Sequence, residues 1–261
     1  MAIRCLTSFV NNGGVKYLHI FDDGSITDED IEKLRSIPCN IDFVGRDCCN
    51  NVVKKEIENF DNAIRYRDEH AFGIKLIDIP IYINEDFIYV DSDVMFYRPF
   101  SIKKVFNSDL VFMYEDDSSY SIDYLDQFFI DRISLVKNLN AGFIYVSKKS
   151  YDIDKINRFL GNSRYKKREW LIEQTAWAYL AAACKSGYWN PNQVAIANGR
   201  GDYNGNVVAV HYISTYRGRL EKDCIAVQGD ISDAPSVLGV LPSQLSRFTD
   251  GIIARALARF T

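Results

Sequence analysis

Short apolar runs along this chain alternate with longer segments in which apolar residues recur at helical spacing. The apolar runs predict strands at 3–10, 17–21, 40–45, 87–90, 110–114, 141–147 and 207–213. The helical spacing predicts helices at 28–36, over most of 52–79 with a break at Pro80, and at 169–184. Strands that alternate with helices in this way are typical of a wound α/β sheet covered by helices.

The most informative polar residues follow the apolar run 87–90. Asp91 and Asp93, separated by Ser92, stand directly after this predicted strand. Ligands of open α/β sheets bind beyond the carboxyl ends of strands, and paired carboxylates there suit a divalent cation that carries phosphates. The same spacing recurs at 28–30 and 152–154, but those acids stand at the starts of predicted elements. The pair at 91–93 therefore predicts chemistry on a nucleotide diphosphate.

His211 emerges from a second apolar run, and Arg217 follows it by six residues. An imidazole that joins two carboxylates on a metal, with a cation one loop further on, can hold a diphosphate leaving group. We therefore expect Asp91, Asp93 and His211 to bind Mn²⁺ or Mg²⁺, with the imidazole favouring Mn²⁺. The alternative is a structural His211 beside a solvated basic loop.

Composition limits the partners and the compartment. The net charge of -4 gives no general attraction to nucleic acid, so no nucleic-acid partner is expected. The six cysteines form no Cys-x-x-Cys pair, and a chain of 261 residues with 47% apolar residues can fold without disulfides, which favours a reducing compartment. No stretch reaches the length of a membrane span, and residues 1–10 do not resemble a signal sequence. A cytoplasmic protein is predicted.

The segment 87–94 resembles the metal-binding strand of GT-A glycosyltransferases, particularly the retaining enzymes of family eight, of the glycogenin and lipopolysaccharide galactosyltransferase type. Further matches follow in the same chain order as in that family, and the resemblance spans about residues 3–219. They are Lys75 ahead of the acidic pair, the segment Asn140-Ala141-Gly142, Glu173-Gln174 at a helix start, and His211 with Arg217.

This resemblance implies a Rossmann-like GT-A fold of the nucleotide-diphospho-sugar transferases, with a mixed central sheet flanked by helices. It implies a catalytic domain at 1–219 and a C-terminal extension at 220–261. The implied enzyme is a hexosyltransferase that moves a sugar, with retention, from a UDP-sugar or another nucleotide-diphosphate donor to a glycan, lipid-linked or protein acceptor. The predicted donor-binding residues are Thr7, Lys75, Asp91, Ser92, Asp93, Asn140, Ala141, Gly142 and Arg217.

Glu173, Gln174 and Asp117 are the predicted catalytic residues. On a helix, Glu173 shares an apolar face with Trp170 and Trp177, so its carboxylate is either paired or has a raised pKa. In a retaining enzyme Gln174 would lie below the anomeric carbon, while Glu173 or the acidic cluster 115–117 would orient sugar hydroxyls. In an inverting enzyme Glu173 would instead be the general base.

Other interpretations of these residues stay open. Glu173 could be a packed residue paired with Arg168 or Lys166, and both tryptophans are expected in the core. A metal-dependent nucleotidyltransferase would also use paired carboxylates, but the turn at 11–14 contains none of the basic residues that its phosphate loop needs. A noncatalytic sugar-nucleotide or glycan-binding module is the third class.

Residues 245–260 form a cationic amphipathic segment. A terminal helix that packs on its own domain is the favoured interpretation, because most amphipathic helices do so. The alternative is a helix that docks on an anionic membrane near a lipid-linked acceptor, which would make the protein peripheral at that membrane.

Overall fold

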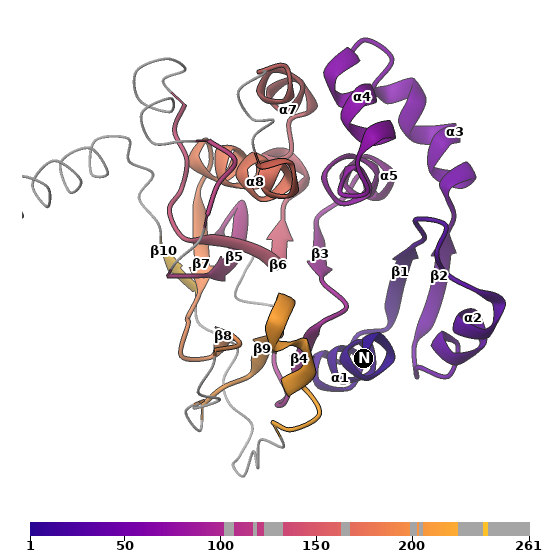
Figure 1. Cartoon of the computed structure of the whole chain (residues 1–261), viewed down its shortest axis with the longest axis vertical. Helices are drawn as coiled ribbons and strands as arrows, with labels where there is room; N and C mark the ends of the chain where they lie inside the picture. The colour runs from indigo at the N-terminus through magenta and orange to yellow at the C-terminus, as the bar shows by residue number, and fades with distance from the viewer. Residues whose placement is uncertain are drawn as a thin grey trace, which may run out of the picture.

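The computed structural model describes residues 1–101, 107–116, 119–122, 133–162, 168–198, 203 and 206–223, together with the backbone of 237–239. Within these ranges, strands form mixed sheets and helices lie against them (Figure 1). The prediction of an α/β protein with a mixed central sheet flanked by helices is confirmed.

The central sheet of the described chain has five strands in the order β10-β7-β5-β6-β3. They are β3 (Phe87–Val90), β5 (Leu110–Tyr114), β6 (Leu139–Val146), β7 (Ser186–Trp189) and β10 (Val237–Gly239). The sheet is mixed because β5 pairs with β7 in parallel and with β6 antiparallel. All residues of β6 are buried, as expected of a strand covered on both faces.

Two smaller sheets stand beside the central one (Figure 1). β4 (Val94–Phe96), β9 (Ala209–His211) and β8 (Val194–Ile196) form a three-stranded sheet in that order. β1 (Tyr17–Phe21) and β2 (Asn40–Val44) pair in parallel on the far side of β3. The loop between β3 and β4 carries the two aspartates, so they lie at the junction of the central and three-stranded sheets.

The first predicted strand, 3–10, is wrong, because this segment lies in the helix α1 (Ala2–Gly13). Phe9 and Val10 are buried and Gly14 ends the helix with a left-handed φ of 59°. Ile3, Leu6 and Val10 recur at helical spacing and pack with Leu34 and Ile37, while Phe9 packs on Val94 and Phe96 of β4. A short apolar run is compatible with either a strand or a helix, and here the 3.6-residue spacing of the apolar residues identifies a helix.

The region 52–79 is helical as predicted, but in several pieces. α2 (Asp28–Leu34) precedes it and begins with a capping box between Thr27 and Asp30. The pieces are α3 (Arg46–Glu56), α4 (Asp61–Glu69), the π-helix η1 (Ile74–Asp78) and α5 (Ile79–Ile83). Pro80 lies in the first turn of α5, where a missing N–H is tolerated.

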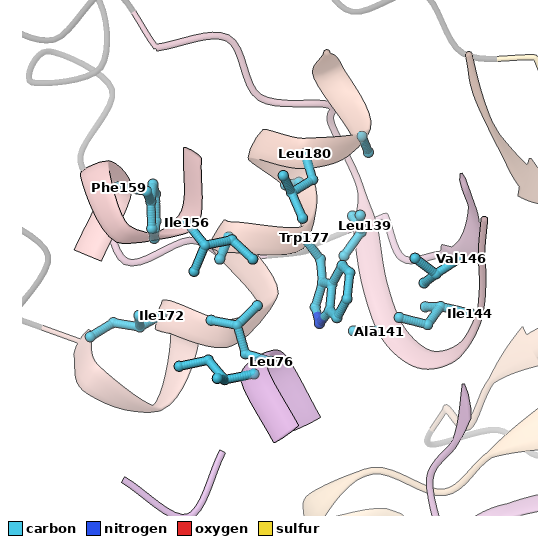
Figure 2. Close-up of a cluster of buried hydrophobic side chains, with 14 of the residues drawn as sticks. Leu76, Leu139, Ala141, Ile144, Val146, Ile156, Phe159, Ile172, Trp177 and Leu180 are labelled. Carbon is cyan, nitrogen blue, oxygen red and sulfur yellow. The ribbon is translucent and has the colours of Figure 1, made fainter. Parts of the chain in front are cut away.

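The main core lies between the central sheet and the helices α7 (Ile153–Leu160) and α8 (Ile172–Ala182) (Figure 2). Trp177 of α8 is 0% exposed and packs beside Leu139 and Ala141 of β6. Leu76 of η1 belongs to the same buried cluster, so η1 also packs against this core. This packing fixes α8 and η1 against the sheet and so positions the polar residues that they carry.

The described residues include five cysteines, all of them free thiols. No helix of the described chain is both long and apolar enough to cross a membrane. The amphipathic segment 245–260, and with it most of the extension proposed at 220–261, lies outside the described residues.

Candidate metal and donor site

A cleft of about 1630 Å³ runs along β3 and collects most of the predicted site residues. Its lining includes Lys75, Asp91, Ser92, Asp93, Asn140, Ala141, Gly142, Glu173, Gln174, His211 and Arg217. These residues come from η1, β6, α8, β9 and η5 (Ser214–Arg219) as well as from the end of β3. The fold therefore brings together in one cleft residues that lie far apart in the sequence.

Asp91, Asp93 and His211 offer three ligand atoms that all lie within 4.8 Å of one another. The His211 Nε2 is 3.0 Å from Asp93 Oδ1 and 3.6 Å from Asp91 Oδ2. Asp93 and His211 are buried, and pairing of Val94 with His211 across β4 and β9 holds the two residues at this distance. Two carboxylates and one imidazole suit a divalent cation such as Mn²⁺, so the residues present fit the predicted metal.

Asn140 of β6 fixes the orientation of the His211 ring. The Asn140 Oδ1 accepts a hydrogen bond from the Gly142 N–H at 2.9 Å, so the amide oxygen faces the His211 Nδ1 at 3.0 Å. The Asn140 Nδ2 donates to Glu115 Oε2 at 3.0 Å, in agreement with this orientation. Nδ1 therefore carries a hydrogen, and Nε2 is the ring atom that faces the aspartates and would bind the metal.

Gly142 is needed for this position of His211. A Cβ at residue 142 would lie 2.3 Å from the Nδ1 and Cε1 of the His211 ring. Any other residue at 142 would displace the imidazole. The predicted segment Asn140-Ala141-Gly142 thus acts here on the histidine: its amide orients the ring and its glycine leaves room for it.

Arg217 lies against Asp93. Its Nε and Nη2 both lie 2.9 Å from Asp93 Oδ2. Burial would raise the pKa of Asp93, but the hydrogen bonds and charges of His211 and Arg217 outweigh it and lower this pKa. Asp93 is therefore a carboxylate at neutral pH. Arg217 itself is 59% exposed, so its guanidinium can also reach an anion in the cleft.

Lys75 joins the aspartate pair to α8. Its Nζ lies 3.3 Å from Asp91 Oδ1 and 3.4 Å from Glu173 Oε1. Burial opposes the charge of Lys75, but Asp91 and Glu173 raise its pKa, so the side chain stays an ammonium. The Tyr89 hydroxyl donates to Asp91 Oδ1 at 2.6 Å, and the Lys75 Nζ lies 4.4 Å from the centre of the Tyr89 ring.

Glu173 and Gln174 both line the cleft at the start of α8. Burial raises the pKa of Glu173, and the Lys75 ammonium opposes that rise. Gln174 donates from its Nε2 to the Ser119 carbonyl at 3.1 Å. The ion-pair partner of Glu173 is thus Lys75; Arg168 instead lies near the Tyr120 carbonyl, at 3.5 Å, and Lys166 is outside the described residues.

The two tryptophans differ. Trp177 is fully buried, as predicted, whereas Trp170 is 66% exposed and lines the cleft, so its assignment to the core is wrong. Of the other predicted residues, Ser92 is exposed at the cleft, and Thr7 lies on α1 but is not among the residues that line the cleft. The predicted catalytic residue Asp117 lies outside the described residues.

Two residues of the site, Tyr89 and Glu115, make contacts that were not predicted from the sequence. Tyr89 stands in the middle of the apolar run 87–90, where its ring counts as one more strand residue, although its hydroxyl binds Asp91. Glu115 was grouped with the acids that orient the sugar, and its contact with the Asn140 amide was not predicted. The signal for Tyr89 was available, since residues i and i+2 of an extended segment point to the same side.

No protein-family model matches the chain, and no curated protein matches it. Among solved structures, the chain is similar to mouse xyloside xylosyltransferase 1 in its apo form, with 10% sequence identity and a TM-score of 0.47. The similarity covers 80% of this chain and 90% of that chain. At this level of similarity, the chemistry of the cleft is the better guide to function.

Proposed function

We propose that this protein is a metal-dependent glycosyltransferase of the GT-A type that uses a nucleotide-diphosphate sugar, with UDP-sugars and Mn²⁺ favoured. The observation that carries the proposal is the convergence of Asp91, Asp93 and His211 within 4.8 Å, beside Arg217, in a large cleft. The catalytic domain is proposed to span 1–219, with the extension at 220–261 following it.

Asp91, Asp93 and His211 would hold the divalent cation. When bound, that cation supplies positive charge that stabilises the diphosphate as the bond to the sugar breaks. Arg217 adds a second positive charge to the same side of the cleft and can bind two phosphate oxygens at once. Electrostatic stabilisation of a leaving group by such placed charges is commonly worth a few kcal/mol per group, about 3–4.

The sugar would lie between the aspartates and α8. Lys75, Glu173 and Gln174 line this space, and Lys75 pairs there with both Asp91 and Glu173. In the retaining reaction that we propose, Gln174 lies below the anomeric carbon, and Glu173 with the cluster 115–117 orients sugar hydroxyls. The Lys75 ammonium beside Glu173 favours the carboxylate form of Glu173, which accepts hydrogen bonds from hydroxyls.

Calorimetric titration with UDP-, GDP- and dTDP-sugars, with and without Mn²⁺, tests the class. We expect one donor to bind only with the metal, and EDTA to abolish its binding and its slow hydrolysis. Asp91→Asn should lower turnover by at least about 100-fold, because it removes a charged ligand of the metal. Asp154→Asn is the matched control, since it alters an acidic pair of the same spacing on α7, where Asp154 pairs with Arg158 outside the cleft.

Absence of metal-dependent binding for every donor would refute the glycosyltransferase assignment. Wild-type turnover in Asp91→Asn would refute the metal site. The anomeric configuration of the product, measured by NMR, tests the stereochemistry. A retained configuration supports the role of Gln174, whereas an inverted one would make Glu173 the general base.

A further inference from the structure

Two aromatic side chains stay exposed at one end of the cleft. Trp170 is 66% exposed and Phe72 is 46% exposed, and both line the cleft that holds the metal ligands. The other two tryptophans, Trp177 and Trp189, are each 0% exposed, so this fold has room for indoles in its core. A large aromatic residue left in a cleft is a frequent sign of a binding site.

The Lys75–Glu173 ion pair places both aromatic residues at the same end. Phe72 lies three residues before Lys75, and Trp170 lies three residues before Glu173. The 3.4 Å contact between Lys75 and Glu173 holds the starts of η1 and α8 side by side. Three residues span at most about 11 Å even when fully extended, so both aromatic residues lie near the paired charges.

The contacts also give the order of the site residues within the cleft. His211 contacts Asp91, Asp91 contacts Lys75, and Lys75 contacts Glu173. Trp170 then follows, three residues before Glu173 in the chain. A donor whose diphosphate lies at the aspartates and whose sugar lies at Lys75 and Glu173 leaves the aromatic end for the second substrate.

The side chains at this end match the chemistry of a sugar ring. A pyranose has faces of C–H groups and a rim of hydroxyls. The C–H groups suit the electron-rich face of an indole or a phenyl ring, and the hydroxyls suit polar neighbours. Gln174 and Arg168 line the same cleft beside Trp170 and supply amide and guanidinium groups.

We propose that Trp170 and Phe72 form a stacking platform for a pyranose ring of the acceptor, so that the acceptor is a glycan. This inference rests on the proposed function, because it assigns the second substrate of the same cleft. Trp170 and Phe72 thereby act in acceptor specificity and not in donor binding.

The fluorescence of Trp170 can report directly on binding at this platform. The chain has three tryptophans, and Trp170 is the exposed one, so acrylamide quenching of tryptophan fluorescence reports mainly on it. The probes are lactose, maltose, and the methyl pyranosides of glucose, galactose and N-acetylglucosamine, added in the presence of Mn²⁺ and UDP. We expect at least one sugar to protect Trp170 from acrylamide in a saturable manner. The absence of saturable protection by every one of these sugars would overturn the proposal.

Variants separate the platform from the donor site. Trp170→Ala and Phe72→Ala should weaken binding of the protecting sugar, or raise its KM in transfer, by about two- to twelve-fold each. Because Trp170→Ala removes the probe, its sugar affinity is measured by calorimetry. Trp170→Phe should restore part of the loss. Val52→Ala is the control, since Val52 is 42% exposed on α3 and does not line the cleft.

The donor measurements distinguish the two possible failures. If the wild-type protein binds no nucleotide sugar, the proposed function fails. If donor binding and hydrolysis are normal but Trp170→Ala leaves the acceptor KM unchanged, the platform alone is refuted. A change in oligomeric state on Trp170→Ala, with unchanged acceptor kinetics, would also refute it and assign Trp170 to a protein contact.

Discussion

Lys75→Met removes the single ammonium shared by Asp91 and Glu173. Methionine keeps most of the side-chain volume, so the change deletes charge with little loss of packing. Lys75 is 9% exposed and Glu173 is 5% exposed, so the Glu173 carboxylate would remain buried opposite an apolar group. We expect a large loss of stability, because a buried charge left without its partner is strongly unfavourable.

The structure sets the size of this loss. Removing one partner of a buried ion pair costs about 3–5 kcal/mol. Asp91 keeps the Tyr89 hydroxyl at 2.6 Å and its side chain is 28% exposed, so most of the cost falls on Glu173. We therefore expect the lower end, roughly 3 kcal/mol, which lowers the Tm by roughly 6–12 °C in a chain of this size.

Urea unfolding followed by circular dichroism measures this loss. Lys33→Met is the matched control, since Lys33 pairs with Glu29 on the exposed side of α2, where solvent screens the pair and its loss should change stability little. The double variant Lys75→Met/Glu173→Gln should regain a large part of the stability, because it removes the unpaired charge. A loss below about 1 kcal/mol in Lys75→Met would refute the reasoning, since it would mean that Glu173 is not charged in the native protein.

The pH dependence of the same variant has a definite sign. Burial raises the pKa of Glu173, and Lys75 opposes that rise, so Lys75→Met raises this pKa further. A carboxyl whose pKa is higher in the folded state stabilises the fold below its unfolded pKa, and this stability is lost as pH rises through the folded pKa. Lys75→Met should therefore lose stability relative to wild type as pH rises above the unfolded pKa of a glutamate, about 4.3, by about 1.4 kcal/mol per added pKa unit. Lys75→Met/Glu173→Gln should show no such slope, and an equal slope in both variants would assign the titration elsewhere.

Two further changes test the site and the fold. Gly142→Ala places a Cβ 2.3 Å from the His211 ring and should weaken Mn²⁺ binding by about 10- to 100-fold in calorimetry, whereas Gly45→Ala, with no atom within 4 Å of the added Cβ, should not. Equal Mn²⁺ affinity in both would exclude the His211 ring from the metal site. Arg67→Met leaves the buried Asp78 without its ion-pair partner and should cost about 3–5 kcal/mol in urea unfolding. A cost near that of an exposed pair would show that Asp78 is protonated in the native state.

The metal site could be predicted from sequence because its signals are local. Asp91 and Asp93 stand directly after an apolar strand, and His211 ends a second one. The sequence, however, does not contain the distance between these strands. The pairing of β4 with β9 sets this distance, because it places Val94 directly opposite His211. That pairing joins segments more than a hundred residues apart, which no periodicity within a short window can report.

The errors have physical causes of the same kind. The run at 3–10 was interpreted as a strand because apolar residues dominate it, although Gly14 and the spacing of its apolar face specify α1. Trp170 was assigned to the helix face that includes Glu173, whereas α8 begins only at Ile172 and Trp170 precedes it. The sequence offers Arg168 and Lys166 as nearby partners of Glu173, but Lys75 of η1 pairs with it because α8 packs on η1.

In Asp91 and Asp93 the two carboxylate oxygens have different neighbours, and the arrangement is the same in both residues. Asp91 Oδ1 is bound by the Tyr89 hydroxyl and lies near Lys75, while Oδ2 faces His211. Asp93 Oδ2 is bound by Arg217, while Oδ1 faces His211. In each carboxylate one oxygen is held by a donor of the protein and the other is directed to the imidazole. The donors fix the rotation of both carboxylates, so a divalent cation would meet three ligand atoms without having to reorient them.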